Sequence, residues 1–169
     1  MSRLSLSSNA LDILKKDHRD IVTKFKLYEK LDSNDKKQQL AADICNCLTI
    51  LCTCEEDLIY PLAQQIVDKS PIQVGEIELN HIRALVEAVR ENSTDDAERD
   101  ALMKVLCEYV HTHIRQEEAT LFPLLDSSVL DLKKIGVAVL DLKLKTIERI
   151  RKLTEFEVME LPSVSVKMN

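Results

Sequence analysis

Apolar residues recur at steps of three and four along five successive segments of this chain, at residues 11–28, 41–62, 74–88, 102–124 and 132–153. Such spacing places apolar side chains on one face of an α-helix. Short clusters that favour turns and helix caps separate the segments. The chain has only two glycines and four prolines, so it has few residues from which hairpins could be built. The sequence therefore predicts an all-α protein.

The lengths of these segments predict how the helices are arranged. Four long helices joined by short connections are expected to form an up-down-up-down four-helix bundle. The last segment is an additional C-terminal helix with a charged outer side, which would pack outside the bundle or dimerise. With 169 residues the chain has room for one core, so we expect a single domain over 1–158 and a C-terminal tail over 159–169.

Charge and hydropathy narrow the classes of partner. The net charge of −6 and the lack of a basic stripe argue against nucleic acid or an anionic membrane surface. No apolar run approaches the roughly 18 residues that span a bilayer. The first residues lack a signal-peptide pattern, and the five cysteines are expected to be reduced, which predicts a cytoplasmic location. The sequence leaves the oligomeric state open.

An internal repeat is the most informative motif. Residues 55–62 and 117–124 share a Glu-Glu pair, an aromatic-Pro step and a following leucine at an offset of 62 residues. His18 and His81 are separated by 63 residues. The chain thus contains one helical hairpin twice.

Polar residues interrupt the apolar faces of the expected helices. His113 precedes Glu117 by four residues, a spacing that puts both side chains on one face, one turn apart. The first copy of the repeat has Leu51 where a histidine is expected. Burying carboxylates without partners costs several kcal/mol, and these faces offer no Lys or Arg. We therefore expect a bound cation, and imidazole with carboxylate suits iron, manganese or zinc. The candidate ligands are His18, Glu55, His81, His113 and Glu117.

These residues resemble the hemerythrin-like HHE cation-binding family over roughly residues 10–157. The ordered series across four helices is more specific than any single motif. The resemblance rests on Leu14-Lys-Lys-Asp-His18, Glu55-Glu56-x-x-x-Tyr60-Pro61, Asn80-His81-Ile82-Arg83 and His113-x-x-x-Glu117-Glu118-x-x-x-Phe122-Pro123.

The resemblance implies a four-helix bundle with a non-haem, usually di-iron, centre. It implies that His81 and His113 bind one metal, that His18 binds the other, and that Glu55 and Glu117 bridge them. The second metal is then short of one ligand, because Leu51 replaces a histidine. Family roles include reversible dioxygen binding, iron or oxygen sensing, and handling of iron under nitrosative stress.

We interpret the chain as a mono- or di-iron protein that binds or senses oxygen, nitric oxide or iron, with a metal ion and a small diatomic ligand as partners. No nucleophile-base pair, phosphate loop or oxyanion arrangement is visible in the sequence, which argues against a conventional enzyme. Two alternatives stay open. Leu51 favours a metal-free bundle that serves as an interaction module, whereas an open iron site could reduce peroxide or nitric oxide.

Several neighbours of the candidate ligands carry further expectations. Cys52 could replace the missing histidine as a thiolate, although a buried cysteine usually serves as a small hydrophobe. Glu56 and Glu118 lie one position beyond the ligand row and are expected to be solvated or paired with lysine. Pro61 and Pro123 are expected to kink or end their helices just past the carboxylates.

Overall fold

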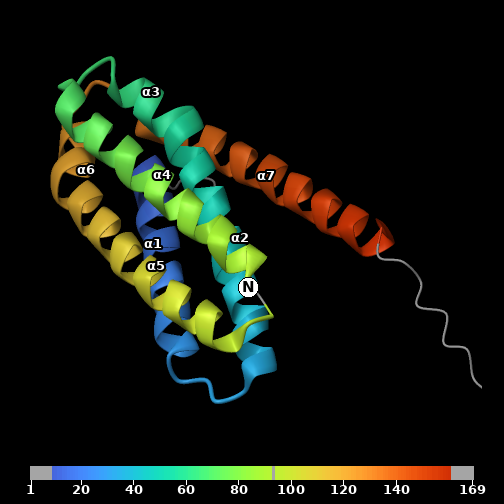
Figure 1. Cartoon of the computed structure of the whole chain (residues 1–169). Coiled ribbons are helices and arrows are strands. Elements are labelled where there is room, and N and C mark those ends of the chain that lie inside the picture. The colour runs from blue at the N-terminus through green and yellow to red at the C-terminus, as the bar shows by residue number, and fades with distance from the viewer. Residues whose placement is uncertain (1–8, 93, 161–169) are drawn as a thin grey trace, which may run out of the picture.

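The computed structural model describes residues 9–92 and 94–160 (Figure 1). Within these ranges the chain forms five helical rods and no strand, which confirms the all-α expectation. Two of the rods contain a short π-helical turn. The rods are α1 (Ala10–Tyr28), α2 (Asn34–Cys54) continued by η1 (Glu55–Ile59) and α3 (Tyr60–Ala63), α4 (Lys69–Glu91), α5 (Asp96–Gln116) continued by η2 (Glu117–Leu121) and α6 (Phe122–Asp126), and α7 (Leu132–Glu160).

Side-chain caps begin three of these helices where the sequence places its turn-forming clusters. The side chain of Asn9 accepts a hydrogen bond from a first-turn amide of α1, Ser33 does so for α2, and Asp95 for α5. Each cap satisfies one backbone N–H that has no partner within its helix. The turn clusters therefore fix where the rods start.

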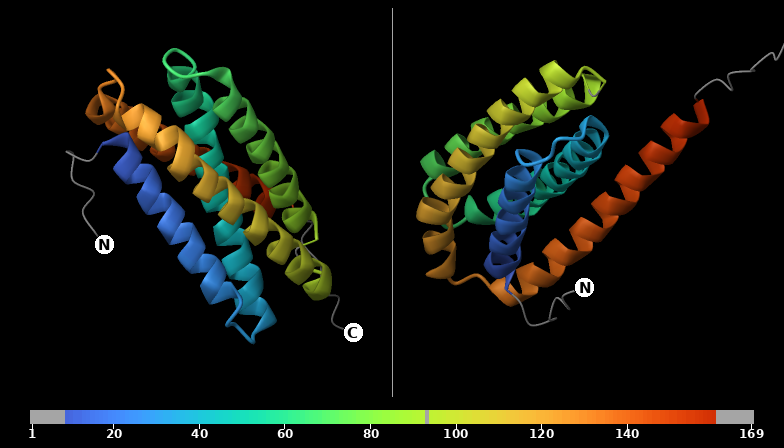
Figure 2. Two further views of the ribbon diagram at one scale, coloured as in Figure 1. Left: turned by 90° about the vertical axis from the view of Figure 1, so that its left-hand side faces the viewer. Right: turned by 90° about the horizontal axis from the view of Figure 1, so that it is seen from below.

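The first four rods form a closed bundle in which neighbours in sequence are neighbours in space (Figure 2). Helix α1 packs against α2, α2 against α4 and α4 against α5, and α5 returns to α1. The buried apolar residues make one core cluster. The up-down-up-down bundle is thus confirmed. Within the described ranges, no helix combines the length and the apolar character needed to span a membrane.

Helix α7 packs on the outside of the bundle, against α1 and α2, and its distal part projects beyond the body of the bundle (Figure 2). This agrees with the expectation of an outer fifth helix. The helix continues to Glu160, whereas the expected tail begins at 159. Residues 161–169 of that tail lie outside the described residues.

The inward face of α4 differs from the one that the sequence suggests. The sequence contains an apolar series through Val74, Ile77 and His81, but Val74 is 36% and Ile77 58% exposed, and His81 is exposed as well. The expectation that His81 faces the interior is therefore wrong. Both series have helical spacing, so periodicity alone cannot choose between them. The residues that α4 buries are Ile72, Gly75, Leu79, Ile82, Val86 and Val89.

The two aromatic-Pro steps coincide with the π-helical turns. Tyr60 donates its backbone N–H to the carbonyl of Glu55, and Phe122 donates to Glu117, so each bond spans five residues instead of four. A proline lacks an N–H and crowds the carbonyl four residues before it, which a wider turn accommodates. Both rods continue for only a few residues after the turn. The prolines thus widen the helices at the carboxylates and precede their ends.

A polar network joins α1, α2 and α5 at the opposite end of the bundle. The Tyr28 hydroxyl donates to Asp100 over 2.6 Å, and Lys37 Nζ donates to the same carboxylate over 2.6 Å. Arg99 Nε donates to the Tyr28 hydroxyl over 3.3 Å. The Tyr28 hydroxyl therefore both donates and accepts a hydrogen bond.

Candidate metal centre

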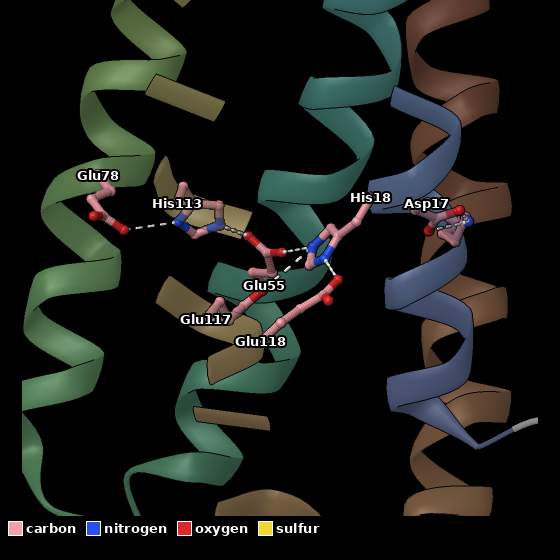
Figure 3. A network of polar contacts seen from close by, with 8 residues as sticks. Asp17, His18, Glu55, Glu78, His113, Glu117 and Glu118 are labelled. Carbon is pink, nitrogen blue, oxygen red and sulfur yellow. Dashed lines mark hydrogen bonds and ion pairs between the residues drawn. The ribbon is translucent and has the colours of Figure 1, made fainter. Parts of the chain in front are cut away.

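Four of the five candidate ligands meet in the interior of the bundle (Figure 3). His18 comes from α1, Glu55 from η1, His113 from α5 and Glu117 from η2. None is more than 5% exposed. We call these four residues the His/Glu cluster.

Glu55 lies at the centre of the His/Glu cluster and faces an imidazole on each side (Figure 3). Its Oε1 is 3.5 Å from His18 Nε2, and its Oε2 is 3.2 Å from His113 Nε2. A carboxylate whose two oxygens face two different histidines is placed to bridge two positions. Helical bundles that hold metal pairs use carboxylates from facing helices in this way.

The ligand atoms of His18, Glu55 and Glu117 are close enough for one ion. These atoms all lie within 4.8 Å of one another. His18 Nε2 is 3.5 Å from both Glu55 Oε1 and Glu117 Oε2. Ligands about 2.0–2.2 Å from a metal stand about 3–4 Å from each other. Small side-chain movements would therefore let the three residues hold a cation.

Glu117 is the member of the cluster that the protein itself leaves unsatisfied. Across the described part of the chain, neither of its carboxylate oxygens has a hydrogen-bond partner. Burial, together with the nearby charge of Glu55, raises the pKa of Glu117 well above its usual range. Without a cation this group holds a proton, whereas a metal ion would supply the missing positive charge. The unsatisfied carboxylate thus fits a cation-binding role.

A second pair of carboxylates orients the two buried histidines (Figure 3). His18 Nδ1 is 2.7 Å from Glu118 Oε1, and His113 Nδ1 is 3.1 Å from Glu78 Oε2. An Nδ1–H that donates to a carboxylate fixes the ring and directs Nε2 inward, as is usual for metal-binding histidines. Both histidines are therefore held with Nε2 toward Glu55.

Sequence reasoning missed the role of these outer carboxylates. The sequence predicts that Glu118 is solvated or paired with lysine, whereas its carboxylate lies 2.7 Å from His18 Nδ1. Glu56 pairs with Arg83 rather than with a lysine. The sequence gives no reason to assign Glu78 to the site, because its role depends on which face of α4 turns inward.

His81 does not join the cluster. Its ring packs edge-to-face against Tyr109 on the outside of the bundle, with 5.7 Å between ring centroids and 70° between planes. His81 directly precedes buried Ile82, so its side chain points about 100° away from that inward residue. Helix α4 contributes Glu78 to the surroundings of His113 instead.

The position expected to hold a further histidine is apolar. Leu51 is buried, one turn before Glu55. Burial and the charge of Glu55 raise the pKa of the neighbouring Cys52 thiol, which favours its neutral form over a metal-binding thiolate. In the portion of the chain that the structure describes, the group of potential ligands is His18, Glu55 and Glu117, without Cys52.

The protonation states of the cluster follow from its contacts. Burial opposes ionisation of Glu55, but the charges and hydrogen bonds of His113 and His18 outweigh it and lower the pKa of Glu55 to about 2. Burial also opposes the imidazolium form of His113, but Glu55 and Glu78 raise the pKa of His113 well above 6.5. The metal-free protein thus holds a Glu55 carboxylate against a His113 imidazolium.

These shifts predict how the stability of the metal-free protein depends on pH. The Glu55 contribution is present above pH 4.5 and is lost as the pH falls toward its lowered pKa. The His113 contribution is present below pH 6.5 and is lost as the pH rises through its raised pKa. The Glu117 contribution is present below pH 4.5 and is lost as the pH rises through its raised pKa. Urea unfolding at a series of pH values should show maximal stability near pH 4.5, and a decline above it that steepens beyond pH 6.5. A free energy of unfolding that keeps rising into the alkaline range would contradict these assignments.

The fold and the cluster together define a class: a four-helix bundle with a buried imidazole and carboxylate site for a cation. The family model of the Hemerythrin HHE cation binding domain matches residues 9–129. The chain belongs to this family. The match covers the four bundle helices and stops before α7, so it is shorter than the span of 10–157 suggested by the sequence motifs.

One curated relative gives a more distant comparison. The chain is 26% identical over 114 residues to a protein named DNA nickase from Nostoc sp. (strain PCC 7120 / SAG 25.82 / UTEX 2576). The aligned region is 68% of this chain but only 32% of the relative, so the chain spans about a third of that protein. No solved structure matches the chain.

Proposed function

We propose that this protein binds iron in the His/Glu cluster and uses it to bind or sense a small diatomic molecule such as oxygen or nitric oxide. The observation that carries the proposal is Glu117, a buried carboxylate without a hydrogen-bond partner among the described residues. Its oxygens lie beside His18 and Glu55, which offer further ligand atoms. A cation at this point would compensate the negative charge of an ionised Glu117, which the metal-free protein avoids by keeping the group protonated.

Each residue of the site has a distinct role in this proposal. His18, Glu55 and Glu117 would hold one ion, and His113 with the second oxygen of Glu55 offers a second position. Glu118 and Glu78 fix the two imidazole rings. Iron would supply open coordination positions for a small ligand and a change of oxidation state. Loading requires protons to leave His113 and Glu117, so the apparent iron affinity should rise with pH.

Iron fits the donor set better than a structural zinc. The cluster offers imidazole nitrogens and carboxylate oxygens, and Cys52 is held as a neutral thiol. Because Leu51 stands where the repeat predicts a histidine, a metal ion bound by His18 has one protein ligand fewer than the duplicated pattern would give. In a metal centre, such a position is open to an exogenous molecule. The same opening favours the second candidate function, reduction of peroxide or nitric oxide.

The activity in the name of the Nostoc relative is not part of this proposal. The chain matches about a third of that protein and carries a net charge of −6, which opposes binding to a polyanion. All five cysteines are free, as a reducing compartment would keep them, which supports a cytoplasmic location.

The experiment is anaerobic reconstitution with ferrous iron, followed by desalting and metal analysis. We expect wild-type protein to retain iron and Glu117→Gln to retain little. Glutamine imitates the protonated Glu117 of the metal-free protein, so the variant should keep its metal-free melting temperature. Glu108→Gln makes the same change at an exposed position of α5 and should bind iron as wild type does. Equal iron contents in Glu117→Gln and wild type would refute the proposed site.

A further inference from the structure

Tyr60, next to the His/Glu cluster, carries a buried hydroxyl group without a partner. The residue is 2% exposed, and within the described ranges its hydroxyl makes no hydrogen bond. A hydroxyl removed from water without a replacement partner is unfavourable, so native proteins rarely retain one without a reason.

The internal repeat shows that the fold does not require this hydroxyl. Tyr60 and Phe122 occupy equivalent positions in the two aromatic-Pro steps, at the offset of 62 residues. Phe122 is 1% exposed and stacks on the ring of His18, with centroids 5.7 Å apart and planes 8° apart. A phenyl ring therefore completes the packing in one copy of the hairpin, whereas the other copy adds an oxygen atom.

Helix α4 makes room for that oxygen at Gly75. A Cβ atom at Gly75 would lie 2.9 Å from Tyr60 Cζ and still closer to the hydroxyl. Gly75 has an ordinary negative φ, so its backbone conformation does not require glycine. The missing side chain at Gly75 is thus needed for the approach of the Tyr60 ring and hydroxyl.

The hydroxyl-bearing ring shares a small cavity with the proposed iron site. The cavity has a volume of about 10 Å³, close to the minimum for one water-sized molecule. Tyr60 and Gly75 line it together with Glu78, His113 and Glu117. It lies where α4, through Gly75 and Glu78, faces His113. A small molecule bound beside His113 would therefore be within the surroundings of Tyr60.

We propose that the Tyr60 hydroxyl donates a hydrogen bond to a small exogenous ligand bound to iron on the His113 side of the cluster. The inference rests on the proposed iron function and deepens it. It implies that the ligand carries a hydrogen-bond acceptor atom, as oxygen, nitric oxide and small anions such as azide do. The Tyr60 hydroxyl then has a hydrogen-bond partner only when the ligand is bound. The site is therefore preorganised for the ligand-bound state.

The test compares Tyr60→Phe with wild type in two states. Without metal, removing an unsatisfied hydroxyl should raise the melting temperature by about 2–6 °C. With iron bound to the wild-type stoichiometry, the affinity for azide, measured by optical titration, should fall about tenfold. Tyr28→Phe is the matched control. Its hydroxyl is bonded to Asp100 and Arg99, so this variant should melt lower and bind azide normally.

The outcomes separate this inference from the proposed function. An unchanged azide affinity at full iron loading, or a metal-free melting temperature that falls, would overturn the role of Tyr60. If Tyr60→Phe lost iron, or lost a visible phenolate-to-iron band, Tyr60 would be a metal ligand. That result would also overturn the hydrogen-bonding role proposed for it. Wild-type protein that takes up no iron would defeat the proposed function, as metal analysis shows before any azide is added.

Discussion

Glu55→Leu is expected to lower the free energy of unfolding of the metal-free protein by about 3–5 kcal/mol, as removal of one partner from a buried ion pair does. Glu55 is fully buried and faces both His18 and His113. Without it, the His113 imidazolium loses its main partner and must give up its proton or remain unpaired. Urea unfolding at pH 6 measures the loss, and iron binding should disappear as well.

Two companion variants make this prediction specific. Glu55→Gln keeps the size of the side chain but not the charge, so it should lose much of the same stability. Glu108→Leu replaces an exposed glutamate of α5 and should change the free energy of unfolding by no more than about 0.5 kcal/mol. A Glu55→Leu protein as stable as wild type would show that the central carboxylate is not paired as the structure has it.

Iron should raise the melting temperature of the wild-type protein by about 5–10 °C at a free iron concentration of about 100 times its dissociation constant. A ligand that binds only the folded state at this excess adds about 2.7 kcal/mol to stability. At one fixed free iron concentration the gain should increase with pH, because loading releases protons from His113 and Glu117 and the affinity therefore rises. Scanning calorimetry in the presence of iron, and again after a chelator, measures the shift.

Glu117→Gln is the control for the thermal shift, because it should keep metal-free stability and lose the response to iron. An identical shift in this variant would place the iron elsewhere, on the acidic surface. If neither iron nor chelator changed the wild-type melting temperature, the result would instead favour the alternative of a metal-free bundle, to which Leu51 points.

The helices, their order and the bundle could be predicted from the sequence, because apolar periodicity and turn clusters are local signals. The repeat also located both carboxylates of the cluster, since Glu55 and Glu117 share a motif in the two hairpins. The buried positions of His18 and His113 followed from the apolar series of α1 and α5 on which they lie. These elements needed no knowledge of which helix faces which.

The orientation of α4 could not be predicted in this way. The helix carries two apolar series of equal spacing, and the series with Leu79 and Ile82 turns inward because it packs against α2 and α5. That choice exposes His81 and brings Glu78 to the ring of His113. A rotation of one helix thus exchanges a histidine for a carboxylate, which a periodic pattern cannot reveal.

Contacts between side chains of different helices could not be predicted from the sequence either. Glu118 lies one position past Glu117, and only the π-helical turn η2 and the approach of α1 bring it to His18. In the sequence, the tyrosine at position 60 is only a different aromatic residue from the phenylalanine of the other repeat. Its hydroxyl gains significance from the structure, through Gly75 and the cavity beside His113. Side chains that act across two helices become recognisable only once the helices are placed.

Anomalous diffraction at the iron edge, from crystals of protein reconstituted with iron, tests the central claim most directly. The account predicts a peak inside the bundle within about 2.0–2.3 Å of His18 Nε2 and of oxygens from Glu55 and Glu117. An empty interior at full iron loading, with iron on surface carboxylates alone, would contradict it.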